Sequence, residues 1–330
     1  MHFSPFRRWA LRLALTACAA LATTGSALAQ TYPDKPIRFF VSYPAGGGAD
    51  FVARHIAQVL GTHLGQPVVV ENRPGASGII ASQATASAPA DGHTIFLADN
   101  ATLVFNPAMF DKLPYDPMKD FTFTSLVAKL DMMLAVREES PIHDVKQFIA
   151  AAQSKPGGLS YGSPGIGLPH HLGVELFLQE SKLKAVPVQY QGIAPAVRDL
   201  MGGQVDFVFV DLAAGLPHIN GKRVRPLAVA SLARLQPLPE LPTFAELGFP
   251  GFEAYAWQGI VMPAGVPPAV VEKFSRALQQ TMKDEKLRAT LRAAGVEPLA
   301  STPEQMRAHM QAETRKWHAL IKARGITRQQ

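Results

Sequence analysis

The segment YPAGGGAD, residues 43–50, joins a β-branched and aromatic run to the start of a helical pattern. Residues 37–41 before it are typical of a buried strand, and residues 50–64 after it repeat apolar side chains at helical spacing. Three consecutive glycines there let backbone N–H groups approach a bound molecule closely. Ligands of open α/β sheets bind at the carboxyl ends of strands. The segment therefore predicts an α/β fold and an anion-binding loop, with Asp50 as the N-cap of the helix.

The spacing of the glycines argues against two phosphate-binding loops. The segment does not follow G-x-G-x-x-G, and no Lys-Ser or Lys-Thr pair follows the glycines. Taken alone, it could also be a tight strand-to-helix turn that binds nothing.

Three further loops made of small and polar residues follow predicted strands. They are RPGASG at residues 73–78, DNAT at 99–102 and YGSPGIG at 161–167. Loops at the strand ends of two lobes can face one another across a cleft. The set predicts a small acidic solute held by main-chain amides and hydroxyl groups.

The alternation of short β-branched runs with helical patterns predicts two α/β lobes with largely parallel sheets. The predicted strands are 37–41, 68–70, 94–97, 159–161, 186–189, 205–210 and 227–230. The predicted helices are 50–64, 144–152, 170–179, 196–201, 268–283 and 303–323. The extended runs 132–136 and 257–262 could cross between lobes. We therefore expect a discontinuous first lobe, 30–131 and 258–330, and a second lobe, 132–257.

The composition of the 330-residue chain is that of an ordinary globular protein. Apolar residues make up 47% and charged residues 18%, without a long polar tract, which argues against disorder. The length suits two domains better than one core.

The first residues resemble a secretory signal peptide, assigned to 1–29. Arg7, Arg8 and Arg12 form a positive region before the short apolar run 13–21, and Ala27-Leu28-Ala29 is a small-x-small cleavage site. A membrane anchor would need roughly 20 uninterrupted apolar residues. The pattern predicts export to the periplasm.

Two alternatives concern the same leader. Leu15-Thr16-Ala17-Cys18 resembles a lipoprotein box, and Arg7-Arg8 is a weak twin-arginine match. Cleavage after Ala29 removes the only cysteine, so the mature chain would have no disulfide. It also lowers Lys+Arg from 32 to 29 against 26 Asp+Glu, and this small excess argues against a nucleic-acid partner.

Candidate catalytic and metal sites are weak. His170, His171 and Glu175 stand at helical spacing, but there is no H-E-x-x-H motif and no third ligand at a recognisable distance. Ser77 and Ser163 have glycine neighbours but do not lie in G-x-S-x-G. We expect no metal, no cofactor and no catalytic residue, and we expect the protein not to be an enzyme.

Seven segments in order resemble the Bug (TctC-like) extracytoplasmic solute receptors of tripartite tricarboxylate transporters. They are YPAGGGAD, VENRPGASG, PADGHTIFLADNATLVFNP, LPYDPMKDFT, LSYGSPGIGLPHHLGVELF, VPVQYQGIAPAVRDLMGGQVDFVF and LPTFAELGFPGFEAYAWQGIVMPAGVP. The resemblance spans residues 32–325. It implies a type II periplasmic-binding-protein fold, with two lobes joined by two crossover strands and a cleft between them.

The resemblance also implies a function and a set of contacts. A small carboxylate would be held between the lobes and delivered to membrane transporter subunits by a monomeric, periplasmic receptor. Carried over by position, the ligand-binding residues are Tyr43, Ala45, Gly46, Gly47, Ser77, Asn100, Thr102, Ser163, Gly165, Gly167, His170 and Asp211.

The chain departs from the family pattern at two places. Leu168 stands where the family commonly has Ser or Thr, and Asp99 is expected to place a carboxylate near the mouth of the cleft. A monocarboxylate with an apolar, aromatic or amino-bearing body is therefore an alternative to a di- or tricarboxylate. A sensory partner of a membrane regulator and, more distantly, a secreted hydrolase using Ser77 or Ser163 are alternative functions.

Overall fold

The computed structural model of the protein describes residues 32–327. The predicted signal peptide at 1–29, with its cleavage site and Cys18, lies outside the described residues. The fold lies within the unit Lys35–Gln330. Within the described part of the chain, no helix has both the length and the apolar character of a membrane span.

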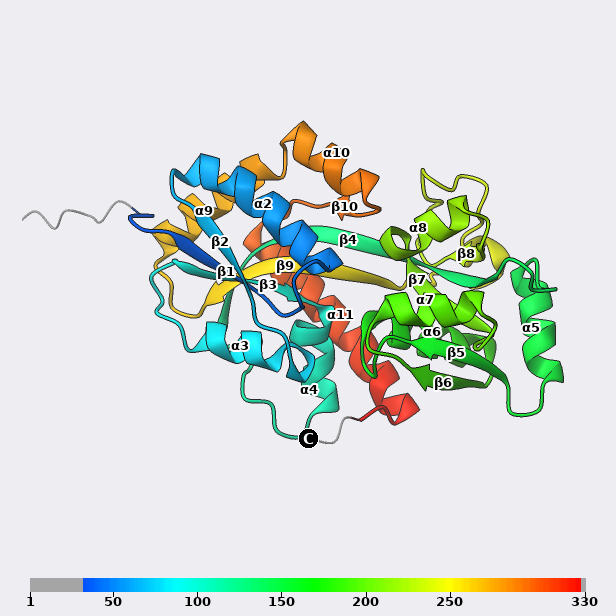
Figure 1. Ribbon diagram of the computed structural model, residues 1–330. Helices are drawn as coiled ribbons and strands as arrows, with labels where there is room; N and C mark the ends of the chain where they lie inside the picture. The colour runs from blue at the N-terminus through cyan, green and yellow to red at the C-terminus, as the bar shows by residue number, and fades with distance from the viewer. Residues whose placement is uncertain (1–31, 328–330) are drawn as a thin grey trace, which may run out of the picture. The chain divides into compact units, whose positions relative to one another are not determined.

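The first lobe is built on three parallel strands, β1 (Ile37–Val41), β2 (Val68–Asn72) and β3 (Thr94–Asp99), in the order β2-β1-β3. Helices α2 (Gly48–Leu64) and α3 (Ile79–Ala86) belong to the connections between them (Figure 1). The central strand β1 is buried at four of its five positions, which its β-branched and aromatic side chains favour. Its carboxyl end leads directly into the glycine loop.

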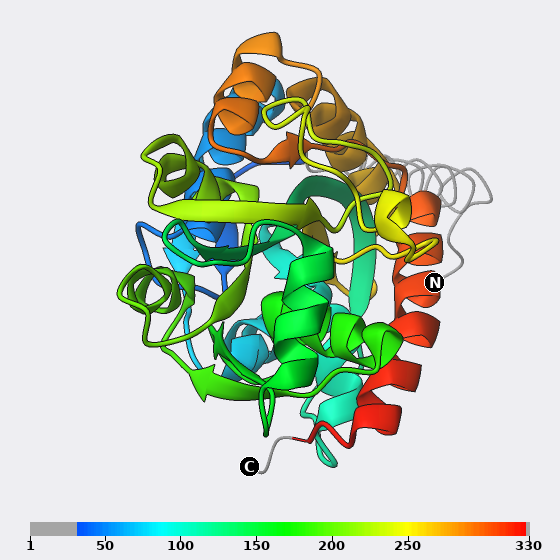
Figure 2. The same cartoon turned by 90° about the vertical axis from the view of Figure 1, so that its right-hand side faces the viewer.

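The second lobe repeats this construction with the parallel strands β5 (Leu159–Ser163), β6 (Ala185–Gln189) and β7 (Phe207–Asp211). Helices α6 (Pro169–Ser181) and α7 (Ile193–Met201) lie in the connections between these strands (Figure 2). The other elements of this lobe are α5 (Val145–Ser154), α8 (Leu212–Asn220), β8 (Val224–Val229) and the 3-10 turn η3 (Ala245–Leu247).

Two strands join the lobes, β4 (Phe121–Arg137) and β9 (Tyr255–Pro263). The first part of β4 pairs antiparallel with β9, and its last part, Met132–Arg137, pairs with β7 and β8. β9 in turn pairs with β3, so one continuous network of hydrogen bonds runs through both lobes. The predicted two-lobed α/β fold with two crossover strands is confirmed.

The C-terminal part of the chain returns to the first lobe. Its elements are α9 (Pro268–Thr281), α10 (Glu285–Ala293), β10 (Glu297–Pro298) and α11 (Pro303–Arg324). Three short helices earlier in the chain also belong to the first lobe: η1 (Ala76–Gly78), η2 (Ala101–Phe105) and α4 (Asn106–Met109). Helix α10 was not predicted, because it buries only Leu287 and Leu291 and is otherwise polar. The side chain of Asp284 caps it by accepting a hydrogen bond from the Leu287 N–H.

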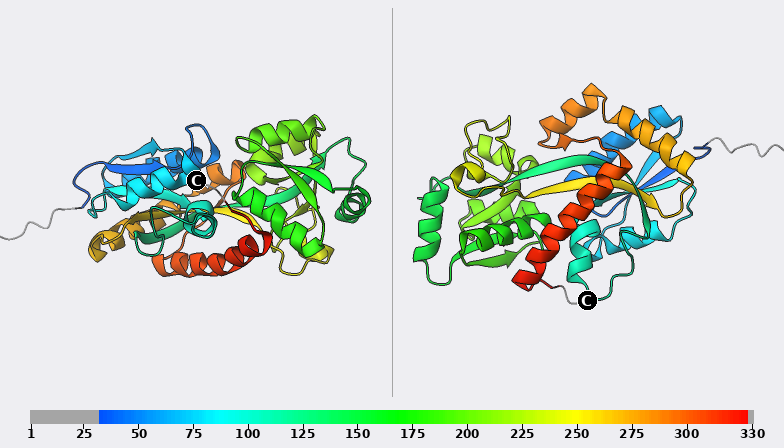
Figure 3. Two further views of the ribbon diagram at one scale, coloured as in Figure 1. Left: turned by 90° about the horizontal axis from the view of Figure 1, so that it is seen from below. Right: turned by 180° about the vertical axis from the view of Figure 1, so that it is seen from behind.

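Helix α11 contacts both lobes. It packs on β4, η2 and α4 of the first lobe and on α6 of the second (Figure 3). At its last turn the Arg324 guanidinium lies 2.6 Å from Glu175 on α6, and the Tyr161 hydroxyl donates to the same carboxylate at 2.9 Å. The helix is therefore fixed to the second lobe by a charge-assisted hydrogen bond as well as by packing.

A buried carboxylate joins α11 to the crossover strand β9. One oxygen of Glu313, Oε2, accepts the indole N–H of Trp257 at 3.1 Å and that of Trp317 at 2.9 Å. All three side chains are buried. Each indole has a single N–H donor, so without this oxygen both would be buried unsatisfied.

Replacing Glu313 tests this junction. Glu313→Leu should lower the free energy of unfolding in urea by about 1–3 kcal/mol for each orphaned indole N–H. Glu313→Gln is the matched control, because its amide oxygen can accept both donors, and we expect a smaller loss. Equal losses in the two variants would contradict the role given to the shared oxygen.

Candidate functional site

The loop at residues 43–50 is held by a carboxylate in the first turn of α2. The N-cap of the helix is Gly47, without a side-chain cap, so the prediction of Asp50 as N-cap is wrong. Asp50 lies two residues inside the helix and accepts the N–H of Gly46 at 2.9 Å, together with Arg54 Nε and Asn72 Nδ2 at 2.9 Å each. Gly46 has φ +81°, a conformation that glycine adopts without strain. The Gly46 amide therefore shapes the loop instead of pointing freely into the cleft.

The partners of Asp50 lower its pKa. The hydrogen bond from Arg54 is the largest cause; burial opposes it, and the Gly46 amide and Asn72 add to it, bringing the pKa of the Asp50 carboxyl to about 2. The carboxylate is thus ionised in the folded protein at neutral pH.

Two cavities share this loop as a wall. The first, of about 900 Å³, we name the serine cavity after Ser42 and Ser77. Its lining residues are Ser42, Tyr43, Pro44, Pro74, Gly75, Ser77, Gly78, Pro164, Gly165, Ile166, Leu168, Gln189, Tyr190, Gln191 and Thr327. Its walls come from the strand ends of both lobes, which is the placement predicted for the ligand cleft.

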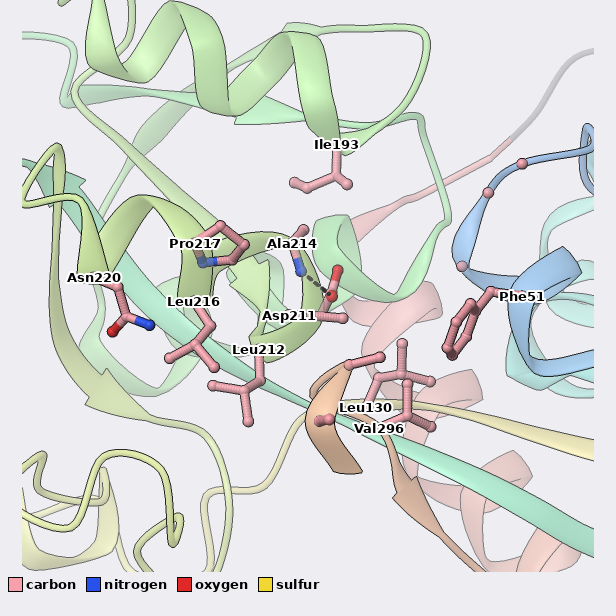
Figure 4. A pocket seen from close by; sticks show the side chains of 16 residues that line it. Phe51, Leu130, Ile193, Asp211, Leu212, Ala214, Leu216, Pro217, Asn220 and Val296 are labelled. Carbon is pink, nitrogen blue, oxygen red and sulfur yellow. Dashed lines mark hydrogen bonds between the residues drawn. The ribbon is translucent and has the colours of Figure 1, made fainter. Parts of the chain in front are cut away.

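The second cavity, of about 680 Å³, we name the aspartate cavity after Asp211. Its lining residues are Gly46, Gly47, Gly48, Phe51, Leu130, Ile193, Asp211, Leu212, Ala213, Ala214, Leu216, Pro217, Asn220, Ala293, Ala294 and Val296 (Figure 4). Phe51 and Val296 of the first lobe face Leu212 of the second, and Asp211 is the charged side chain among these described residues. The cavity is largely apolar.

Asp211 is bound to the second lobe on two sides. It caps α8 by accepting the Ala214 N–H at 2.9 Å, and its other oxygen lies 3.0 Å from His170 Nε2. Burial alone would raise the pKa of the Asp211 carboxyl, but the hydrogen bond and charge of His170 and the backbone N–H groups outweigh it, and the pKa lies below its ordinary value. His170 thus stands behind Asp211 and acts as its partner.

The second glycine-containing loop also satisfies its own polar groups. The Ser163 hydroxyl lies 3.3 Å from both the N–H and the carbonyl of Gly165, and the Gly167 N–H donates to His171 Nδ1 at 3.2 Å. Leu168 is the N-cap of α6 and supplies no side-chain cap. These donors fix the loop in place.

Asp99 does not lie at the mouth of the cleft as predicted. It is 5% exposed. Its carboxylate accepts the Tyr43 hydroxyl at 2.5 Å and both the N–H and the hydroxyl of Thr102 at 2.8 Å. The reason is local: Thr102 stands three residues after Asp99, where a short side chain can turn back onto the backbone.

The structure divides the residues predicted to bind ligand into three groups. Tyr43, Ser77 and Gly165 line the serine cavity, and Gly46, Gly47 and Asp211 line the aspartate cavity. Ala45, Asn100, Thr102, Ser163, Gly167 and His170 line neither cavity. Ala45 is exposed between the two cavities, and Asn100 is buried and donates to the Tyr255 carbonyl at 3.1 Å.

Ser42 is a candidate that sequence reasoning missed. It follows the last residue of β1, is 6% exposed, and lines the serine cavity. Its hydroxyl has no hydrogen-bond partner among residues 32–327. A serine at the end of the strand before the glycine loop was the available signal.

The side chains considered for a metal have other partners. His170 faces Asp211, whereas Glu175 binds Arg324 and Tyr161. In the described range 32–327, no group of three or more His, Cys, Asp or Glu side chains is placed to hold a metal ion.

Comparison with known proteins gives one consistent relationship. The family described as "Tripartite tricarboxylate transporter family receptor" matches residues 52–326. Protein BugT of Bordetella pertussis (strain Tohama I) is 33% identical over 309 residues, which cover 92% of this chain and 95% of BugT.

Solved structures give the same relationship. Rpa4515 of R. palustris, solved with adipate, is 34% identical with a TM-score of 0.82 and covers 90% of this chain and 99% of its own. MatC (Rpa3494) of Rhodopseudomonas palustris, solved with bound malate, is 29% identical with a TM-score of 0.78 and covers 88% of this chain and 100% of its own.

Asp50→Asn should destabilise the protein in a pH-dependent way. Because the folded pKa is about 2 and lies below the ordinary value of 3.8, the stabilisation is present above pH 4. It amounts to about 2 kcal/mol at most and is lost as the pH falls from about 4 to about 2. Urea unfolding between pH 7 and pH 3 measures it, with the exposed Asp111→Asn as control. If the difference in unfolding free energy between wild type and variant stays constant with pH, the stabilisation does not come from the ionised Asp50 carboxylate.

Gly295 tests the contact between the lobes beside the aspartate cavity. It has φ +74°, and a Cβ there would lie 2.7 Å from the Ala213 nitrogen and 2.9 Å from the Leu212 carbonyl carbon. Gly65 has a similar φ of +70° with no atom within 4 Å of its Cβ position, so Gly65→Ala carries the backbone strain alone. Gly295→Ala should lose roughly 1–3 kcal/mol more in urea unfolding. Equal losses of unfolding free energy in Gly295→Ala and Gly65→Ala would contradict the close contact between the lobes at Gly295.

Proposed function

Because the chain belongs to the tripartite tricarboxylate transporter receptor (TctC) family, we propose that it is a solute receptor that captures a small carboxylate in the cleft between its lobes. The observation that carries the proposal is the pair of cavities whose walls come from the strand ends of both lobes and meet at the 43–50 loop. Two similar structures, those of Rpa4515 and MatC, were solved with the carboxylates adipate and malate.

The lobes would close on the ligand by a hinge motion. β4 and β9 are the strands that connect the two sheets, and bending of such strands is the ordinary way in which two-lobed receptors close. We propose that the first lobe comprises 30–131 and 258–330 and the second 132–257.

We propose that the ligand-binding residues are the twelve predicted from the sequence. These are Tyr43, Ala45, Gly46, Gly47, Ser77, Asn100, Thr102, Ser163, Gly165, Gly167, His170 and Asp211. In this proposal the residues that line a cavity contact the ligand, and the others hold those residues in position. Hydrogen bonds of Thr102 to Asp99, of Ser163 to Gly165 and of His170 to Asp211 favour this positioning role.

The receptor would be exported by the leader at 1–29, act in the periplasm as a monomer, and pass its ligand to membrane transporter subunits. We propose that it has no catalytic role. Neither Ser77 nor Ser163 has a histidine as hydrogen-bond partner within the described residues, whereas the nucleophile of a Ser-His-Asp hydrolase has one.

Ligand screening tests the proposal. Purified mature protein should be stabilised in thermal unfolding by one or more acids from a panel of mono-, di- and tricarboxylates, by about 2.7 kcal/mol at a ligand concentration of 100 Kd. Small-angle scattering should show a smaller radius of gyration when the ligand is bound. No response to any acid, or conversion of an acid to a product, would refute the proposal.

A further inference from the structure

The serine cavity contains an unused hydroxyl group beside a helix start. The Ser42 Oγ is buried in the cavity wall without a partner in the described chain. Gly78, the N-cap of α3, packs against it so closely that a Cβ there would lie 3.3 Å from the Ser42 Cβ. A buried hydroxyl with no partner is costly, and a helix N-terminus favours negative charge. Both features favour an acceptor with negative charge at this place.

Ser77 adds a second hydroxyl to the same place. It lies in η1 directly before Gly78, and its side chain lines the serine cavity. Its φ of +56° is unusual for a residue with a side chain, and Asn106 holds its carbonyl at 2.9 Å. Ser42, at the end of β1, and Ser77, directly before Gly78, thus line one cavity.

Several other donors near the cleft already have acceptors within the protein. The Gly46 amide binds Asp50, the Gly165 amide binds Ser163, and the Gly167 amide binds His171. The hydroxyls of Tyr43 and Tyr190 donate to Asp99 and Asp199. A second carboxylate buried in the cavity would find few donors, and burying a charge without partners is strongly unfavourable.

The part of the second-lobe wall that Pro164, Ile166 and Leu168 form in the serine cavity is apolar. Leu168 caps no helix group, and its side chain lines the cavity together with Ile166 and Pro164. Ile166 is 39% exposed, which is unusual for a side chain of its size unless something covers it. Gln189 and Gln191, the two side-chain amides elsewhere on this wall, are exposed. The apolar part of the wall suits a hydrocarbon body.

The neighbouring aspartate cavity does not suit a second carboxylate. Its charged side chain, Asp211, offers only acceptor oxygens, and its pKa is held low by His170 and backbone N–H groups against the effect of burial. An anionic group directed toward it would meet a like charge.

We propose that the ligand is a monocarboxylate with an apolar body, whose carboxylate binds at Ser42 and Ser77 and whose body packs against Leu168. This rests on the proposed function, and it adds a substrate class and makes Leu168 the residue that determines specificity. The ligand would differ from the dicarboxylates adipate and malate, with which the two similar structures were solved.

Matched ligand pairs test the proposal by titration calorimetry on the wild-type mature protein. The pairs are hexanoate with adipate, benzoate with terephthalate, and cyclohexanecarboxylate with its 1,4-dicarboxylate. At least one monocarboxylate should bind more tightly than its dicarboxylate by about tenfold or more. If only dicarboxylates bind, or bind more tightly in each pair, the inference is overturned and the proposed function stands. If no acid binds, here or in the wider panel, both fall.

Three variants locate the effect. Ser42→Ala should weaken binding of the best monocarboxylate by about tenfold through loss of the donor. Ser275→Ala, which removes another buried hydroxyl without a partner but lies on α9 away from both cavities, should leave affinity unchanged. Leu168→Ser should bring the affinities for the monocarboxylate and the dicarboxylate of a pair closer together. The new serine can cap helix α6, so the variant should fold. Unchanged affinity in Ser42→Ala, or an unchanged ratio in Leu168→Ser, would overturn the assignment.

Discussion

The pairing of β4 with β9 in one lobe and with β7 and β8 in the other is the constraint on which the molecule depends. A single 17-residue strand takes part in both sheets, so neither lobe can be built without it. Its residues from Met132 to Val136 are fully buried. The carboxyl ends of the parallel strands then meet at the boundary between the lobes, and this is where both cavities lie.

The loops around the boundary satisfy most of their own polar groups. Asp50 holds the glycine loop, Ser163 and His171 hold the loop before α6, and Thr102 holds Asp99. Such internal bonds keep the cleft walls in one geometry before any ligand arrives, which lowers the entropy cost of binding. They also leave few groups for a ligand, so the chemistry of the cleft rests on a small number of side chains.

The sequence alone predicted the strands and helices whose periodicity is strong, and it predicted both crossover runs. It missed α8, which contains Pro217 inside the helix, and α10, in which only Leu287 and Leu291 are buried and the apolar pattern is weak. It misplaced Asp50 and Asp99, because either short carboxylate can bond to more than one backbone group nearby, and three-dimensional neighbours such as Arg54 and Tyr43 decide which. Ser42 went unnoticed for a related reason: the absence of a partner for its hydroxyl is visible only when the surrounding side chains are in place.

Helix α11 has a mechanical consequence for this arrangement. Two connecting strands alone would allow the lobes both to bend and to twist about the strand pair. The ion pair of Arg324 with Glu175 adds a third point of attachment, at the far end of a helix that otherwise packs on the first lobe. The Arg324 side chain is 33% exposed and that of Glu175 is 11% exposed, so dissolved salt screens this attachment only in part, and it holds the two lobes together over a wide range of ionic strength.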